Sequence, residues 1–282
     1  MPAGGLPLGV MAAVLAGAML HAGWNVALKA GPDKALETAL LLAGGVLIGL
    51  LLMPFVAWPQ PASYPALAIS ATLHVAYFAL LMAAYQSGEM AQLYPMMRGL
   101  PPMLLALLGP LFGEALGIAR GFGIVLISLG VLSLAGTRGH VPHGRGSVFA
   151  LLNAIVIAAY TLNDGIGARL SGAPFSYTLG VFAASGAVFV AISLAWRGRA
   201  LAALPLRRWV IGVVAAASSI GSYGLALWAM TRAPIAAIAA LRETAILFGM
   251  GLAWLVLGER MGFTRLIAGA LILSGAVVLR LF

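Results

Sequence analysis

Long apolar runs separated by short polar segments form the main pattern of this sequence. Ten runs of roughly 18 or more residues are each long enough to cross about 30 Å of hydrocarbon as a helix. The runs lie near 6–28, 38–58, 66–86, 92–112, 119–136, 147–168, 175–196, 209–230, 235–257 and 263–281. The segments between them are short, so no second domain is expected outside the bilayer. The pattern predicts an all-α membrane protein with ten transmembrane helices.

The composition agrees with this class. Of the 282 residues, 62% are hydrophobic and 8% are charged, whereas about a quarter of the residues in a soluble domain are charged. Cysteine is absent, which excludes disulfides, thiolate metal sites and cysteine nucleophiles. The formal net charge of +9 comes from basic residues scattered at helix ends and in loops. This distribution indicates contact with lipid headgroups and no nucleic-acid partner. We expect neither a metal nor a cofactor.

A charged motif occurs twice, at about half the chain length. "FGEALGIAR" (112–120) resembles "LGERMGFTR" (257–265), and five residues of the first half match five of the second at a constant offset of 145. The pairs are Gly113 with Gly258, Glu114 with Glu259, Gly117 with Gly262, Arg120 with Arg265 and Gly130 with Gly275. This spacing indicates an internal repeat. In each copy we expect Gly to end one helix and Glu to open the next, where the helix dipole favours an anion.

The repeat predicts two halves with opposite orientations in the membrane. Five predicted helices separate the two copies of the motif, and an odd number of crossings places the copies on opposite faces. We therefore predict two inverted five-helix repeats, residues 1–140 and 141–282. Inverted repeats are typical of secondary transporters, in which the substrate site lies near the midplane between the repeats.

Three segments carry a resemblance to a known family. They are "HAGWNVALKAG" (21–31), "RGLPPMLLALLGPLFGEALG" (98–117) and "RETAILFGMGLAWLVLGERMG" (242–262). With ten spans in two inverted halves, the chain resembles the EamA group of the drug/metabolite transporter superfamily over nearly its whole length. The resemblance implies a ten-helix fold with a central cavity, and export or exchange of small metabolites such as amino acids. It does not imply one substrate.

Polar side chains inside the apolar runs are the candidates for substrate contact, because polar groups are costly in a bilayer and face the bundle interior by default. Two sets lie at helical spacing on one helix face each. The first and third runs supply them: His21, Trp24 and Asn25, and His74, Tyr77 and Tyr85. We expect the two stripes to line one wall of a cavity. The alternative for each is ordinary packing and hydrogen bonding between helices.

Arginine occurs inside two of the runs. Arg98 follows Tyr94 by one turn and precedes Pro101 and Pro102, so it lies where the helical hydrogen-bond ladder is interrupted. Its planar guanidinium suits a substrate carboxylate or phosphate. Arg242 matches Arg98 in the repeat at an offset of 144. It is followed by Glu243, but adjacent residues in a helix point about 100° apart and need not pair. The alternatives are an extended side chain that reaches the membrane interface and a structural ion pair.

Two further candidates lie on one face of the sixth run. Tyr160 and Asp164 are four residues apart, and Tyr160 is a candidate for substrate contact. Asp164 is the candidate for proton coupling. Because Asp164 lies near the expected end of its helix, a structural cap is the alternative.

Together with the resemblance, the sequence favours a secondary transporter that exports small polar metabolites, with amino acids as the first candidate, across the bacterial inner membrane. A phosphate-binding loop of the G-x-x-x-x-G-K-[ST] type is absent, so the energy would come from gradients. The expected partners are a small-molecule substrate and the lipid bilayer, and a monomer is compatible with the pattern. Alternatives are another solute class (sugar phosphate, nucleotide sugar or cationic drug), an intramembrane enzyme or a scaffold protein. Zinc-protease and serine-hydrolase motifs are absent, so no enzyme is predicted.

The charge distribution gives a separate prediction of orientation. With the N-terminus in the cytoplasm, four basic residues would lie at cytoplasmic helix ends and ten at the opposite ends, while Arg98 and Arg242 lie within the membrane. The positive-inside rule therefore favours both termini outside. Family members more often resemble the opposite arrangement.

Overall fold

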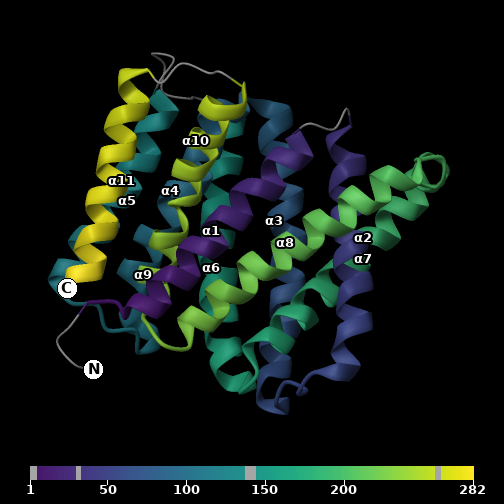
Figure 1. Cartoon of the computed structure of the whole chain (residues 1–282), viewed down its shortest axis with the longest axis horizontal. Coiled ribbons are helices and arrows are strands. Elements are labelled where there is room, and N and C mark those ends of the chain that lie inside the picture. Colours follow the sequence, from purple (N-terminus) through teal and green to yellow (C-terminus); the bar gives the residue numbers. More distant parts are fainter. Residues whose placement is uncertain (1–4, 30–32, 137–143, 258–261) are drawn as a thin grey trace.

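The structure is a computed structural model that describes residues 5–29, 33–136, 144–257 and 262–282. Within these ranges the chain folds into eleven α-helices with short 3-10 turns, and it contains no strand (Figure 1). The α-helices are α1 (Leu8–Lys29), α2 (Lys34–Leu52), α3 (Tyr64–Ser87), α4 (Met90–Leu108), α5 (Ile118–Ser133), α6 (Arg145–Ser171), α7 (Pro174–Ala202), α8 (Leu206–Met230), α9 (Ile235–Arg242), α10 (Ala245–Leu257) and α11 (Phe263–Leu281).

All ten predicted runs are helical at the expected positions. In the part of the chain that the structure describes, eight helical segments are long and apolar enough to cross a membrane. The remaining two are α5, which is shorter, and α4, in which Gln92, Arg98 and three prolines lower the mean hydropathy. The ninth run is divided into α9 and α10 by a turn at Glu243 and Thr244. The sequence pattern did not predict this break.

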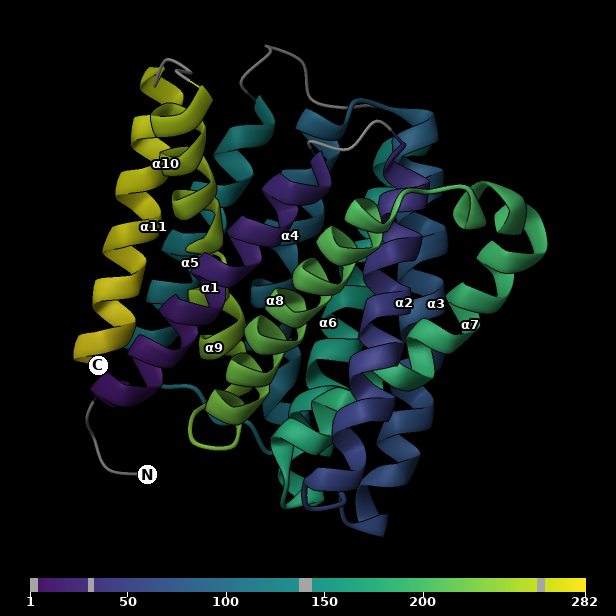
Figure 2. The same ribbon diagram turned by 45° about the vertical axis from the view of Figure 1, so that its right-hand side comes forward.

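Helix α9 lies at the centre of the bundle. Its residues from Ile235 to Leu241 are all buried, and it contacts α1, α4, α5, α6, α8 and α11. Around it, α1 packs along α8, α3 along α6, and α5 along α11, while α2 lies against both α7 and α8. Figure 2 shows α2 beside α7 and α8, and the last turns of α7 projecting from the bundle beyond a bend at Arg197.

The outer surface of the bundle is apolar. Leu107, Leu111 and Ile118 are 74%, 79% and 95% exposed, as expected for side chains that face lipid tails. The segment before α1 meets the last turn of α11 on one face, where the Leu6 N–H donates to the Leu279 carbonyl (3.1 Å) (Figure 1). An even number of crossings returns the chain to the face where it began, so this arrangement agrees with ten spans.

Helices α5 and α11 approach each other through glycine. A Cβ on Gly275 would lie 2.5 Å from the Gly123 carbonyl oxygen, and a Cβ on Gly130 would lie 2.9 Å from the Ala268 carbonyl oxygen. Both distances are shorter than any side chain tolerates, so these glycines set the separation of the two helices. The two contacts are related by the same offset of 145 residues that relates the charged motifs.

Candidate functional site at the centre of the bundle

A bidentate ion pair joins α4 to the break between α9 and α10. Arg98 Nε donates to Glu243 Oε2 (3.0 Å), and Arg98 Nη2 lies 2.9 Å from Glu243 Oε1. The two side chains are 13% and 6% exposed. Arg98 is the ninth residue of α4, and Glu243 follows the eight residues of α9. At 1.5 Å per residue, both lie about 12 Å from a helix end, near the middle of a 30 Å hydrocarbon core.

The helix break is a tight turn that frees Glu243 to reach across to α4. The N–H groups of Glu243 and Thr244 bond to carbonyls three residues back (2.9 and 3.1 Å), and the Thr244 hydroxyl donates to the Leu241 carbonyl (2.7 Å). These bonds satisfy carbonyls at the end of α9, where an α-helix would otherwise leave them without partners. Broken helices of this kind are tolerated in membranes where protein or water satisfies the backbone.

Aromatic side chains from three helices gather beside the ion pair. The ring of His74 lies 4.5 Å from that of Tyr160 and 6.4 Å from that of Tyr223, and Tyr77 lies 5.9 Å from Tyr160 (centroid to centroid). We call this group with the charged residues the central cluster. It comprises His74, Tyr77, Tyr94, Arg98, Tyr160, Tyr223, Arg242 and Glu243.

Electrostatic contacts extend the central cluster to other predicted residues. The hydroxyl groups of Tyr94, Tyr160 and Tyr77 lie within electrostatic range of the Arg98 guanidinium. Tyr85 lies within range of Arg98 as well. The structure therefore brings the polar stripe of α3 to Arg98.

Arg242 does not pair with its neighbour Glu243. Its guanidinium carbon lies 5.1 Å from the centroid of the Tyr223 ring, a cation–π contact. The sequence-based expectation that adjacent residues need not pair is thus confirmed, and the partner of Glu243 is Arg98. Two guanidinium groups and one carboxylate consequently share the centre of the bundle.

The polar stripe of α1 is divided between two places. His21 lies within electrostatic range of Arg98 and Arg242, and its ring meets that of Trp24 edge to face (4.9 Å). Trp24 itself packs against an apolar cluster of α2 and α8, which contains Leu41, Leu42, Ala215 and Ala216. The Asn25 amide donates to the His21 carbonyl of its own helix (2.8 Å). His21 is therefore the member of this stripe that approaches the ion pair.

Asp164 is fully buried between three helices. Its Oδ2 accepts a hydrogen bond from the Tyr223 hydroxyl (2.6 Å), and its Oδ1 accepts from the Tyr177 hydroxyl (3.1 Å) and the Asn163 amide (3.1 Å). The expected location near a helix end is wrong, because α6 continues for seven residues to Ser171. Asp164 is thus no helix cap. It links α6 to α7 and α8, and through Tyr223 it touches the central cluster.

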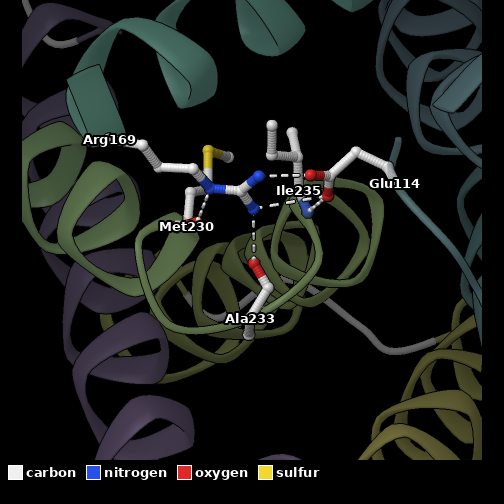
Figure 3. A network of polar contacts seen from close by, with 5 residues as sticks. All are labelled: Glu114, Arg169, Met230, Ala233 and Ile235. Carbon is white, nitrogen blue, oxygen red and sulfur yellow. Dashed lines mark hydrogen bonds and ion pairs between the residues drawn. The ribbon is translucent and has the colours of Figure 1, made fainter. Parts of the chain in front are cut away.

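A second ion pair joins Glu114 to Arg169 (Figure 3). The Glu114 side chain is buried, whereas that of Arg169 is 33% exposed. Arg169 also donates to the Met230 carbonyl (2.8 Å) and the Ala233 carbonyl (3.2 Å), and Glu114 accepts from the Ile235 N–H (2.9 Å). We call these five residues the end network. It joins the α4–α5 connection, the last turn of α6 and the α8–α9 turn.

Glu114 was expected to open the helix that follows it, and this expectation is wrong. Its carboxylate instead accepts from the first residue of α9, in the other half of the chain. The preceding Gly113 has φ +79°, a conformation that favours glycine and ends the 3-10 turn before Glu114. The repeat counterparts Gly258 and Glu259 lie outside the described residues. Arg169 and Tyr177 were not predicted, although arginine near the end of an apolar run was a visible signal.

Comparisons with known proteins agree with this architecture. Residues 144–281 match the EamA-like transporter family. A solved structure titled "Crystal structure of protein" covers 96% of this chain and 96% of its own, with a TM-score of 0.73 and 20% identity. In all, 28 chains of solved structures match, whereas no curated protein does. The family is one of membrane transporters, and the apolar helices agree with a multi-pass membrane protein. The match of residues 144–281 to the EamA-like transporter family places this half of the chain in the drug/metabolite transporter superfamily.

Proposed function

We propose that the protein is a secondary transporter that exports amino acids across the bacterial inner membrane, and that the central cluster binds them. The observation that carries this proposal is the bidentate pair of Arg98 and Glu243 at mid-length of α4 and at the break of the ninth span. Broken helices near the midplane are where transporters of several folds bind their substrates.

The ion pair favours a zwitterion over a substrate with one charge. An amino acid can place its carboxylate on Arg98 and its ammonium group on Glu243, so each buried charge exchanges one partner for another. A substrate with one charge would leave Arg98 or Glu243 unpaired, which costs about 3–5 kcal/mol at a buried site. The rings of His74, Tyr77 and Tyr160 then supply apolar and polar edges for the substrate's side chain.

Two inverted repeats, residues 1–140 and 141–282, are part of the proposal. Under an exchange of halves, the pairing of α1 with α8 becomes the pairing of α6 with α3, and both pairings occur. The contact of Gly275 with Gly123 likewise becomes the contact of Gly130 with Ala268. These coincidences support two equivalent halves around α9 and α4, which alternating access requires.

The proposal is tested by uptake into proteoliposomes. Labelled neutral, acidic and basic amino acids are offered to the wild type, Arg98→Ala and His74→Ala. We expect saturable uptake of neutral amino acids that both substitutions reduce. Arg208→Ala is the matched control, because it also leaves a buried glutamate, Glu37, without its partner (2.7 Å) but lies outside the central cluster.

The outcomes of this experiment separate the solute classes. Loss of uptake in Arg98→Ala with retention in folded Arg208→Ala supports a site at the ion pair. Failure of folded wild type to transport any amino acid would refute the amino-acid proposal. The same assay with a sugar phosphate, a nucleotide sugar or a cationic drug then identifies the class, since Arg242 is a second cation suited to phosphate.

Orientation is tested with single cysteines, which the cysteine-free sequence allows. Ala62 lies exposed between α2 and α3, and Ala203 lies exposed after α7, five crossings further on. The positive-inside rule predicts that Ala62→Cys reacts with a membrane-impermeant maleimide in intact cells and that Ala203→Cys does not. The reverse labelling would place both termini in the cytoplasm.

A further inference from the structure

Asp164 differs from the other buried carboxylates in its partners. Among the described residues, four carboxylate side chains are buried: Glu37, Glu114, Asp164 and Glu243. The three glutamates each face a guanidinium, from Arg208, Arg169 and Arg98. The contacts of Asp164 come instead from two hydroxyl groups and one amide, all neutral.

A buried carboxylate without a cation is a natural proton acceptor. Burial of a charge without a paired cation is costly, and uptake of a proton removes that charge. The three donated hydrogen bonds favour the ionised form, so the two protonation states oppose each other at this site. A metal cation is a poorer occupant, because it needs several oxygen lone pairs, whereas the three neighbours of Asp164 direct hydrogens at the carboxylate. The side chain is 0% exposed, so the proton would be held away from bulk water.

The Tyr223 hydroxyl can form a hydrogen bond with Asp164 in both protonation states of the Asp164 carboxyl group. When Asp164 is ionised, the hydroxyl donates to Oδ2 (2.6 Å) and presents its lone pair to the central cluster. When Asp164 carries a proton on Oδ2, that oxygen donates, and the Tyr223 hydroxyl accepts. The hydrogen of Tyr223 is then free to point toward the central cluster, so one protonation event changes the polarity of a group beside the substrate.

We propose that Asp164 is a proton-binding site and that Tyr223 transmits its protonation state to the central cluster. In this proposal, binding of a proton at Asp164 and binding of the substrate's ammonium group beside Tyr223 exclude each other. This inference rests on the proposed transport function and names its coupling ion. An ammonium group needs the acceptor that Tyr223 offers while Asp164 is ionised. A proton on Asp164 withdraws that acceptor. Proton and substrate therefore compete, which is the requirement for export against an inward proton flow.

Other titratable groups surround Asp164 and belong to the same electrostatic environment. Tyr160 lies one turn earlier on α6 and within electrostatic range of Asp164. The helices packed against α6 contribute further groups near this site, namely His74 and Tyr77 of α3, Arg98 of α4, Tyr177 of α7, Tyr223 of α8 and Arg242 of α9.

The proton site is tested without any substrate. Infrared difference spectra of the purified protein between acid and alkaline pH report protonated carboxylic acids through their carbonyl stretching band. We expect a band in the wild type that is missing in the near-isosteric Asp164→Asn and retained in Asp33→Asn, which removes an exposed carboxylate. A wild-type spectrum identical to that of folded Asp164→Asn would overturn the proposal, whatever the transport assays show.

The coupling is tested in proteoliposomes loaded with labelled L-leucine under an imposed pH gradient. We expect gradient-driven transport to fall by about tenfold or more in Asp164→Asn, while exchange of leucine without a gradient persists in that variant. Tyr223→Phe removes the acceptor itself, so we expect it to lower both gradient-driven transport and exchange. Tyr177→Phe is the matched control, because it removes one hydroxyl donor from Asp164 but leaves Tyr223 in place, and its coupling should be unchanged. Equal losses in both tyrosine variants would overturn the role of Tyr223.

Two results would separate this proposal from the proposed function. Leucine exchange in the wild type that ignores the pH gradient, or follows a sodium gradient, would overturn proton coupling and leave transport standing. Absence of leucine exchange by folded protein would refute the amino-acid proposal, and the infrared band would then decide the proton site alone.

Discussion

The central pair of Arg98 with Glu243 and the end network of Glu114 with Arg169 have the same chemistry and different surroundings. In the end network, Arg169 also binds two backbone carbonyls and Glu114 also binds a backbone N–H. In the central pair, the hydrogen bonds of Arg98 are to Glu243, and tyrosine and histidine rings stand around them. In the end network, backbone groups of the protein satisfy the hydrogen-bonding groups of both charged side chains. In the central pair, the two charged side chains bind each other and remain able to bind a ligand.

This difference assigns a role to each pair. A guanidinium bound to backbone carbonyls cannot exchange partners without breaking the turn that supplies them, so the end network holds three segments together. A pair held only by its own two side chains exchanges partners more easily. Burial alone therefore does not identify a binding site in a membrane protein, and the backbone partners of each charge are the more informative observation.

The largest expected effect on stability is that of Arg169→Ala. The substitution leaves Glu114 without its guanidinium and removes the donors to Met230 and Ala233. We expect a loss of about 3–5 kcal/mol in the free energy of unfolding, measured by thermal or denaturant unfolding in detergent. The protein that remains folded should transport with an unchanged KM. A raised KM would show that the end network also contacts the substrate.

A smaller effect on stability is expected when both partners of the central pair are removed. Each single substitution, Arg98→Gln or Glu243→Gln, leaves one buried charge unpaired and should cost about 3 kcal/mol. The double variant leaves no buried charge at this position and should recover most of that loss. Uptake of neutral amino acids should be lost in all three. Recovery of uptake in the double variant would contradict direct binding by the pair.

The smallest effect is expected at an exposed pair, Asp33 with Arg197, which serves as the reference for the two pairs that contain a buried glutamate. The side chains are 41% and 52% exposed, so Asp33→Asn should cost less than about 1 kcal/mol. Hydrogen bonds from the Leu36 backbone, followed by the contact with Arg197, lower the pKa of Asp33. Its contribution is therefore present above the ordinary aspartate pKa and is lost as the pH falls through the lowered value. Unfolding measured across this acidic range should show a wild-type slope that Asp33→Asn lacks.

Hydropathy was sufficient to predict the membrane helices, because each helix is specified by its own stretch of apolar residues. All ten predicted runs correspond to helices in the described residues. The break in the ninth span was missed because Glu243 and Thr244 are neither glycine nor proline, the residues by which breaks are usually recognised. The break is stabilised by Glu243 reaching Arg98, 145 residues away, and a long-range contact of this kind leaves no local pattern.

Several residues of the candidate site were selected individually from the sequence, but Tyr177 and Tyr223 were not, and the pairing of the charged residues was not predicted. Polar residues in apolar runs identified Arg98, Glu243 and Asp164 separately. The sequence did not show that Glu243 faces Arg98 or that Glu114 binds the start of α9, because both contacts depend on how helices pack in space. The alternative of a structural cap at Asp164 is wrong, because the end of α6 lies seven residues beyond it.

The central claim is that the charge of Glu243 binds the substrate, whereas the charge of Glu114 stabilises the fold. The most direct test is the concentration dependence of neutral amino-acid uptake by wild type, Glu243→Gln and Glu114→Gln in proteoliposomes. We predict that Glu243→Gln lowers kcat/KM by about a hundredfold, from a loss of roughly 3 kcal/mol at a buried charge pair, while Glu114→Gln keeps the wild-type KM. A wild-type KM in Glu243→Gln, or equal losses in both variants, would contradict the claim.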